Sequence, residues 1–181
     1  MRLVNSETEA QVIRAHWFSV GLITIAFVVS QGNLLRIIGP LEPSILALQL
    51  AFTPKAFARV VTAWGPEGLA RYRAHFLFDF VHPLVYAGFG WIWVSCTALF
   101  AWVRPSIQRA LRLALPIAGS CDLLENVLHW RLLDRLPEIA ATPVFLSACL
   151  SSLKWLLAVF FACAMSLSLY RWLHRRDVIA P

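Results

Sequence analysis

Four long apolar stretches constrain the fold of this 181-residue chain more than any other feature. Each reaches or nearly reaches the ~20 residues that a helix needs to cross the hydrocarbon core of a bilayer. Only 14% of the residues are charged, whereas a soluble domain has about 25% charged residues. We therefore expect an all-α fold, a four-helix transmembrane bundle that makes one integral membrane domain of residues 1–181. The expected spans are about 14–34, 75–102, 111–133 and 143–172.

The segment between the first two spans is expected to form a short amphipathic interfacial helix within about 44–64. Thr53-Pro54 is typical of a helix start, and Gly65-Pro66 of a helix end. Apolar residues between them recur with a helical period. Such a helix either lies on the membrane surface or forms a lid over the mouth of the bundle, and the sequence leaves both interpretations open. The apolar positions are Phe57, Val60, Val61 and Trp64.

The net charge of +6 comes mainly from arginines at the expected helix ends. The loop 104–112 and the carboxyl-terminal RWLHRR are basic and almost free of acidic residues, whereas the opposite loops also contain acids. Because cytoplasmic loops carry an excess of basic residues, we expect both termini in the cytoplasm. Basic residues at helix ends bind lipid headgroups, so no nucleic-acid partner is expected.

Two stripes of polar residues interrupt the second and third expected spans. Their spacings are 4-3-4 and 3-1-3, so each stripe follows one face of a helix. A charged group in the middle of a bilayer costs a few kcal/mol or more and often marks a site. The first stripe is His75, Asp79, His82 and Tyr86, and the second is Asp122, Glu125, Asn126 and His129.

The rise of a helix, about 1.5 Å per residue, predicts that the two stripes meet. The second and third spans run antiparallel, which brings Asp79 level with His129 and Tyr86 level with Asp122. Lys154 of the fourth span comes to the same depth, as does the polar end of the first span. The sequence therefore predicts one polar site in one half of the bilayer.

This predicted site has three carboxyl groups and one lysine, so at least one carboxyl is expected to keep its proton and to act as a general acid. Such an acid beside a histidine suits proton transfer on a lipid-soluble substrate. We therefore expect a pocket for a membrane lipid or another lipophilic small molecule. The predicted catalytic residues are Asp79, Asp122 and Glu125, and the predicted ligand-binding residues are Tyr86, Asn126, Lys154, His82, His129 and Arg73.

Other interpretations of the same residues stay open. The polar set can serve only to hold helices together, in an accessory or structural subunit of a larger membrane complex, or it can line a proton or ion pathway in a homo-oligomer. A metal or a haem between histidines is a further alternative, but the Glu-x3-His spacing matches di-iron bundles only loosely, so no cofactor is expected. The alternative metal ligands are His75, Asp79, His82, Glu125 and His129.

Four motifs together resemble an uncharacterised family of small four-span bacterial integral membrane proteins. They are WGPEG, D-x3-P-x2-Y, DLLEN and a lysine in the last span, and they cover about residues 45–160. The resemblance implies four helices, a polar interior and a place in the bacterial inner membrane; it implies no activity. Buried carboxylates in a small bundle also resemble the architecture of emopamil-binding-protein-like sterol isomerases, without a shared motif.

Overall fold

The computed structural model describes residues 6–176, with side chains from residue 16 to residue 174. All regular structure in this part of the chain is helical, which confirms the all-α prediction. The helices are α1 (Ser6–Ile38), α2 (Ile45–Gln49), α3 (Pro54–Asp79), α4 (His82–Cys96), α5 (Pro105–Asp134) and α6 (Ala141–Arg176).

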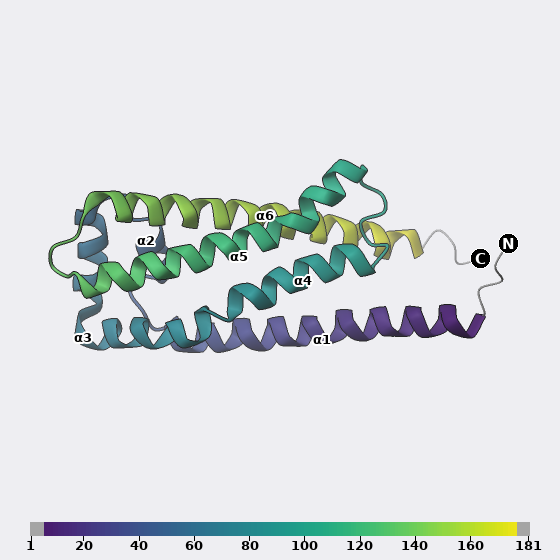
Figure 1. Cartoon of the computed structure of the whole chain (residues 1–181), viewed down its shortest axis with the longest axis horizontal. Helices are drawn as coiled ribbons and strands as arrows, with labels where there is room; N and C mark the ends of the chain where they lie inside the picture. The colour runs from purple at the N-terminus through teal and green to yellow at the C-terminus, as the bar shows by residue number, and fades with distance from the viewer. Residues whose placement is uncertain (1–5, 177–181) are drawn as a thin grey trace.

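The long helices lie along one axis and alternate in direction (Figure 1). Helix α1 follows one edge of the molecule and α6 the opposite edge, with α4 and α5 between them; α1 packs on α4, α4 on α5, and α5 on α6. The start of α1, the end of α6 and the α4–α5 connection share one end (Figure 1). The α5–α6 connection and the first part of α3 lie at the other end.

Two helices are long and apolar enough to cross a membrane, over His16–Ile38 and Ala141–His174. Helices α3 and α4 qualify together as a bent pair, which gives up to three spans. Helix α5 does not qualify, since its polar stripe lowers its hydropathy. The chain is thus consistent with an integral membrane protein, and the four-span count stays a prediction. Residues 1–5 and 177–181, on which the predicted orientation of the termini partly depends, lie outside the described residues.

The second span was expected to be one continuous helix over 75–102, and the structure differs from this. Helix α3 ends at Asp79, α4 begins at His82, and the two are bent by 43°. Pro83 explains the break, because proline has no N–H to donate to the carbonyl four residues earlier, that of Asp79, and its ring would clash with that carbonyl in a continuous helix. Helix α4 ends at Cys96, so residues 97–102 belong to a connection.

The predicted start of the amphipathic helix is confirmed, because the Thr53 hydroxyl accepts a hydrogen bond of 3.2 Å from the Ala56 N–H. Gly65, with φ of 62°, breaks the helical geometry, but the chain then resumes a helix up to Asp79. The apolar stripe of this first part of α3 is buried, and Lys55 and Arg59 are exposed. The short helix α2 lies just before it, also within the predicted segment.

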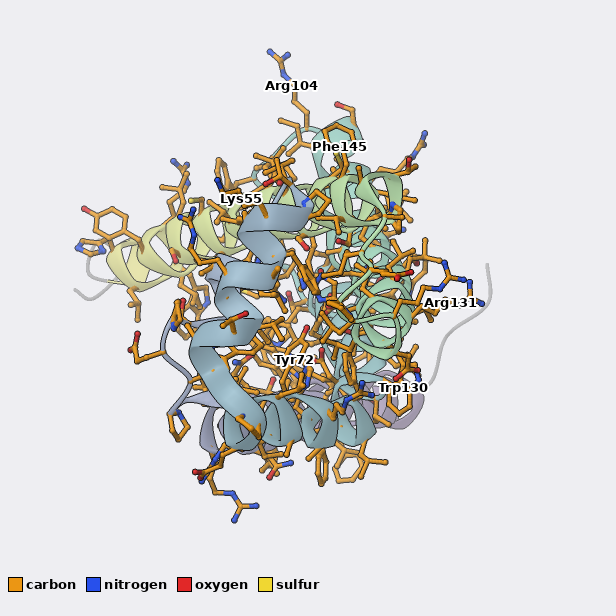
Figure 2. The ribbon with its side chains drawn as sticks, turned by 90° about the vertical axis from the view of Figure 1, so that its left-hand side faces the viewer. Lys55, Tyr72, Arg104, Trp130, Arg131 and Phe145 are labelled. Carbon is orange, nitrogen blue, oxygen red and sulfur yellow. The ribbon has the colours of Figure 1, made fainter. Side chains whose placement is uncertain are left out.

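The first part of α3 crosses the end of the bundle and covers it (Figure 2). Its apolar stripe belongs to one buried cluster with Leu132 of α5 and Val144 of α6. A second apolar cluster around Leu115 and Phe161 lies toward the other end. In α5 and α6 the polar residues fall between the members of these two clusters, so the fold holds the polar layer between two apolar layers.

Candidate functional site

Hydrogen bonds to Asp122 connect the second polar stripe both to Tyr86 of the first stripe and to Lys154 of α6. The Lys154 ammonium donates hydrogen bonds of 2.8 Å to Asp122 and 2.7 Å to Glu125. The Tyr86 hydroxyl donates a third bond, of 3.1 Å, to the other oxygen of Asp122. All four side chains are buried, and Glu125 is 0% exposed. The predicted match in depth between α4, α5 and α6 is therefore confirmed at these residues.

Asn126 bridges α5 to the break between α3 and α4. Its amide donates a bond of 3.0 Å to the backbone carbonyl of Asp79, one of the last carbonyls of α3, which lack partners within the helix. Asp79 was expected level with His129 but lies level with Asn126, three residues earlier, which is about one helical turn. The break between α3 and α4, which the sequence analysis did not predict, accounts for this shift. The Asp79 carboxylate lies 3.4 Å from Nε2 of His75.

Tyr72 is a buried site residue that sequence reasoning missed. Its hydroxyl forms a hydrogen bond of 2.7 Å with Nδ1 of His129, and its ring stacks on His75 with 4.4 Å between centroids. Arginines on both sides of Tyr72 made this position resemble a helix end at the membrane surface. A signal was present, however, because Tyr72, His75 and Asp79 follow each other at i, i+3 and i+7.

Arg73 does not join the other predicted residues. Its guanidinium donates a bond of 2.7 Å to Asp134 at the surface, where both side chains are exposed. The predicted ligand-binding role of Arg73 therefore has no support in the geometry.

The alternative metal ligands are likewise not gathered around one point. Among the described residues, no group of three or more His, Cys, Asp and Glu side chains has the arrangement of a metal site. The Tyr72 ring lies against both His75 and His129, in the space that a haem between these histidines would need. His82 is bonded elsewhere, with Nδ1 at 2.8 Å from the hydroxyl of Ser30 in α1.

A cavity of about 520 Å³ adjoins the polar layer, and all six helices contribute to its lining. Most of its wall is apolar. Gln49 and Trp155, which sequence reasoning did not single out, also line it, and the Trp155 indole donates a bond of 3.0 Å to the Gln49 side chain. The ionisable lining residues and Tyr86 form what we call the polar floor: His75, Asp79, His82, Tyr86, Asp122 and Lys154.

Besides Arg73 at the surface, three buried residues of the predicted site lie outside this lining. Glu125, Asn126 and His129 are buried and are absent from the cavity wall. The polar layer thus has two parts: a closed part within the helix packing, centred on Glu125, and the polar floor, which faces the cavity. Lys154 belongs to both, because its ammonium binds Glu125 as well as Asp122.

No family model, curated protein or solved structure matches this chain. The resemblance to small four-span bacterial membrane proteins therefore stays a prediction, and the function has to be inferred from the site itself.

Proposed function

We propose that this protein binds a lipophilic small molecule in the cavity and transfers protons to and from it. One observation carries the proposal: a single cavity combines a mostly apolar wall with a floor of ionisable side chains. Its volume of about 520 Å³ lies within the ≈ 300–1,000 Å³ of typical small-molecule sites. An apolar wall suits a lipid-soluble body, and the polar floor supplies groups that can exchange protons.

In this proposal Asp79 is the group that exchanges protons with the ligand. It lines the cavity, and no lysine or arginine of the described side chains lies within salt-bridge distance of its carboxylate, in contrast to Asp122 and Glu125. His75 lies 3.4 Å away and can share the proton. Asp79 gives one proton to the bound molecule, and the Asp79–His75 pair takes another proton from that molecule. The site therefore returns to its starting charge without a further reactant.

Asp122, Tyr86 and Lys154 form the fixed side of the floor. Lys154 balances the charge of the two carboxylates that it bonds, and Tyr86 fixes the orientation of Asp122. Glu125, which does not reach the cavity, acts by positioning Lys154. Asn126 positions Asp79 through the backbone bond at the helix break.

We further propose that the chain crosses the bacterial inner membrane four times, with α5 as the third span along the chain and both termini in the cytoplasm. The alternating helix directions support an even number of crossings (Figure 1). The outer face of α1 supports contact with lipid, because Leu22, Ile25 and Val29 are each more than half exposed.

Two measurements on detergent-purified protein test the function. Native mass spectrometry should find a retained organic molecule in the wild type. After incubation in heavy water and return to ordinary water, that molecule should keep deuterium on carbon, because protons taken up from Asp79 originate in solvent, whereas deuterium on oxygen or nitrogen exchanges back. Asp79→Asn, which has the same size but cannot exchange a proton, should bind the molecule and leave its mass unchanged.

The elution volume and melting temperature of Asp79→Asn are compared with those of the wild type. Equal deuterium uptake by a folded Asp79→Asn would refute the catalytic role. Loss of the folded state in both Asp79→Asn and Glu125→Gln, with no retained molecule in the wild type, would instead favour a purely structural network. A protein that co-purifies in fixed stoichiometry would favour the accessory-subunit function.

A further inference from the structure

We propose that the ligand enters sideways from the bilayer, between α1 and α6, and that its head donates hydrogen bonds and carries no negative charge. Such a molecule is a long-chain alcohol or amine rather than a phosphate or carboxylate lipid. This inference rests on the proposed function, since it names the class of ligand for the same cavity.

The mouth of the cavity follows from how the helices pack. Helix α1 packs on α3 and α4, and α6 packs on α5 and α2, but α1 and α6 form no packed interface with each other in the described chain. They lie at opposite edges of the molecule in Figure 1, yet both line the cavity. Leu35 of α1 and Trp155 of α6 line it while 58% and 44% exposed. In a membrane, these partly exposed apolar edges meet the acyl chains of lipid.

The ionisable residues of the cavity lie toward one end, beside apolar residues of α1 and α2, and the lining beyond them is mainly apolar. Along α6 the lining of the cavity runs from Lys154 to Ser166, a distance of about 18 Å at 1.5 Å per residue. The part beyond Lys154 is mainly apolar and faces aromatic residues of α1 and α4, Phe27 and Phe89. An amphipathic molecule would therefore place its head at the polar floor and its tail along Ala158–Met165.

The charges of the floor select against an anionic head. Lys154 is the only Lys or Arg among the lining residues, and its ammonium already donates to two carboxylates. A phosphate would find no unpaired cation there and would lie near the carboxylates of Asp79 and Asp122. Repulsion between like charges is strong in a medium of low dielectric constant.

A hydroxyl or ammonium head has suitable partners on the same floor. It can donate to Asp79, whose carboxylate has His75 as its only partner within salt-bridge distance among the described side chains. His82 also lines the cavity, and because the Ser30 hydroxyl occupies Nδ1, Nε2 is the ring nitrogen that His82 can offer to a ligand. The third N–H of Lys154 can serve a neutral oxygen. A head that donates hydrogen bonds therefore finds partners on the polar floor, whereas the carboxylates there would repel an anionic head.

Photoreactive probes test the route and the head together. Four probes carry the same alkyl chain with a diazirine at its tail, and end in an alcohol, an amine, a carboxylate or a phosphate. Each is added to protein in nanodiscs, activated by light, and mapped by peptide mass spectrometry. We expect the alcohol and the amine to label Ala158–Met165 at least tenfold more than the two anionic probes.

Two matched variants identify the mouth. Ala162 is exposed and lines the cavity, so Ala162→Trp should block labelling by the alcohol and amine probes. The neighbouring Cys163 is also exposed but does not line the cavity, so the probes should label Cys163→Trp as strongly as they label the wild type. Equal labelling by all three proteins would refute entry between α1 and α6.

The remaining outcomes separate this inference from the function on which it rests. Anionic probes that label the cavity as strongly as the alcohol would refute the proposed head and leave the lipophilic pocket standing. If every probe labels the wild-type lining no more than it labels the lining of Ala162→Trp, and the wild type also retains no organic molecule, then both the proposed head group and the proposed pocket are refuted.

Discussion

Lys154 should be the residue whose charge the fold needs most, and Lys154→Met tests this directly. Methionine keeps the length and the apolar stem of lysine but removes the ammonium. Asp122 and Glu125 then lose their hydrogen bonds of 2.8 and 2.7 Å and remain buried. Removing one partner of a buried ion pair typically costs about 3–5 kcal/mol, because a buried charge is left without compensation.

The expected loss is large enough to measure in detergent. For a chain of this size, 1 kcal/mol corresponds to about 2–4 °C in melting temperature, so Lys154→Met should melt ~6–20 °C below the wild type. The assay is the fraction of protein that stays monodisperse after heating. Lys55, the only other lysine, is exposed on α3, and Lys55→Met should change stability by no more than about 0.5 kcal/mol.

A triple variant separates lost charge balance from lost packing. Adding Asp122→Asn and Glu125→Gln to Lys154→Met removes the uncompensated carboxylates, and replacement of a whole buried ion pair is often close to neutral. The triple variant should therefore recover more than half of the lost melting temperature. The electrostatic reasoning is wrong if Lys154→Met and Lys55→Met have the same melting temperature. It is also wrong if the triple variant melts at no higher temperature than Lys154→Met.

Three other substitutions probe the packing around the site, each by melting temperature. Gly119→Ala should cost about 1–3 kcal/mol by overpacking, because a Cβ there would lie 2.8 Å from the Pro83 carbonyl; Gly21, with no atom within 4 Å of its Cβ position, should accept Ala without loss. Asn126→Ala should cost about 1–3 kcal/mol, since the Asp79 carbonyl loses its buried donor, and an unchanged melting temperature would contradict that role. Thr53→Ala should cost about 0.5–2 kcal/mol through loss of the N-cap, unlike Thr62→Ala on the exposed face of the same helix.

Local patterns in the sequence were sufficient for the helix start at Thr53-Pro54 and for the matching level of Tyr86 and Asp122. The Thr53-Pro54 start depends on one hydrogen bond within three residues, and the match of Tyr86 with Asp122 depends only on helix rise and antiparallel order. Both quantities can be worked out without knowing how the helices pack.

Properties that depend on the partner of a residue could not be predicted in the same way. Arg73 stands near a helix end, from which its side chain can reach into the site or outward; its bond to Asp134 depends on where α5 ends. Pro83 signals a disturbed helix, but a bend and a complete break have the same local signal. The separation of α1 from α6 is a property of the whole packing, so the cavity has no signature in either helix.

The two parts of the polar layer have different requirements, which argues that they can be separated by mutation. Holding helices together requires paired charges, and Lys154 with Asp122 and Glu125 meets this requirement inside the packing. Proton transfer requires a group that faces the ligand and can change its charge, and Asp79 faces the cavity with no lysine or arginine partner in the described part of the chain. If Asp79 had only a structural role, Asp79→Asn would lower the melting temperature and there would be no proton exchange to lose. In a site of the kind proposed, Asp79→Asn stays folded and loses proton exchange, whereas Lys154→Met acts first on stability.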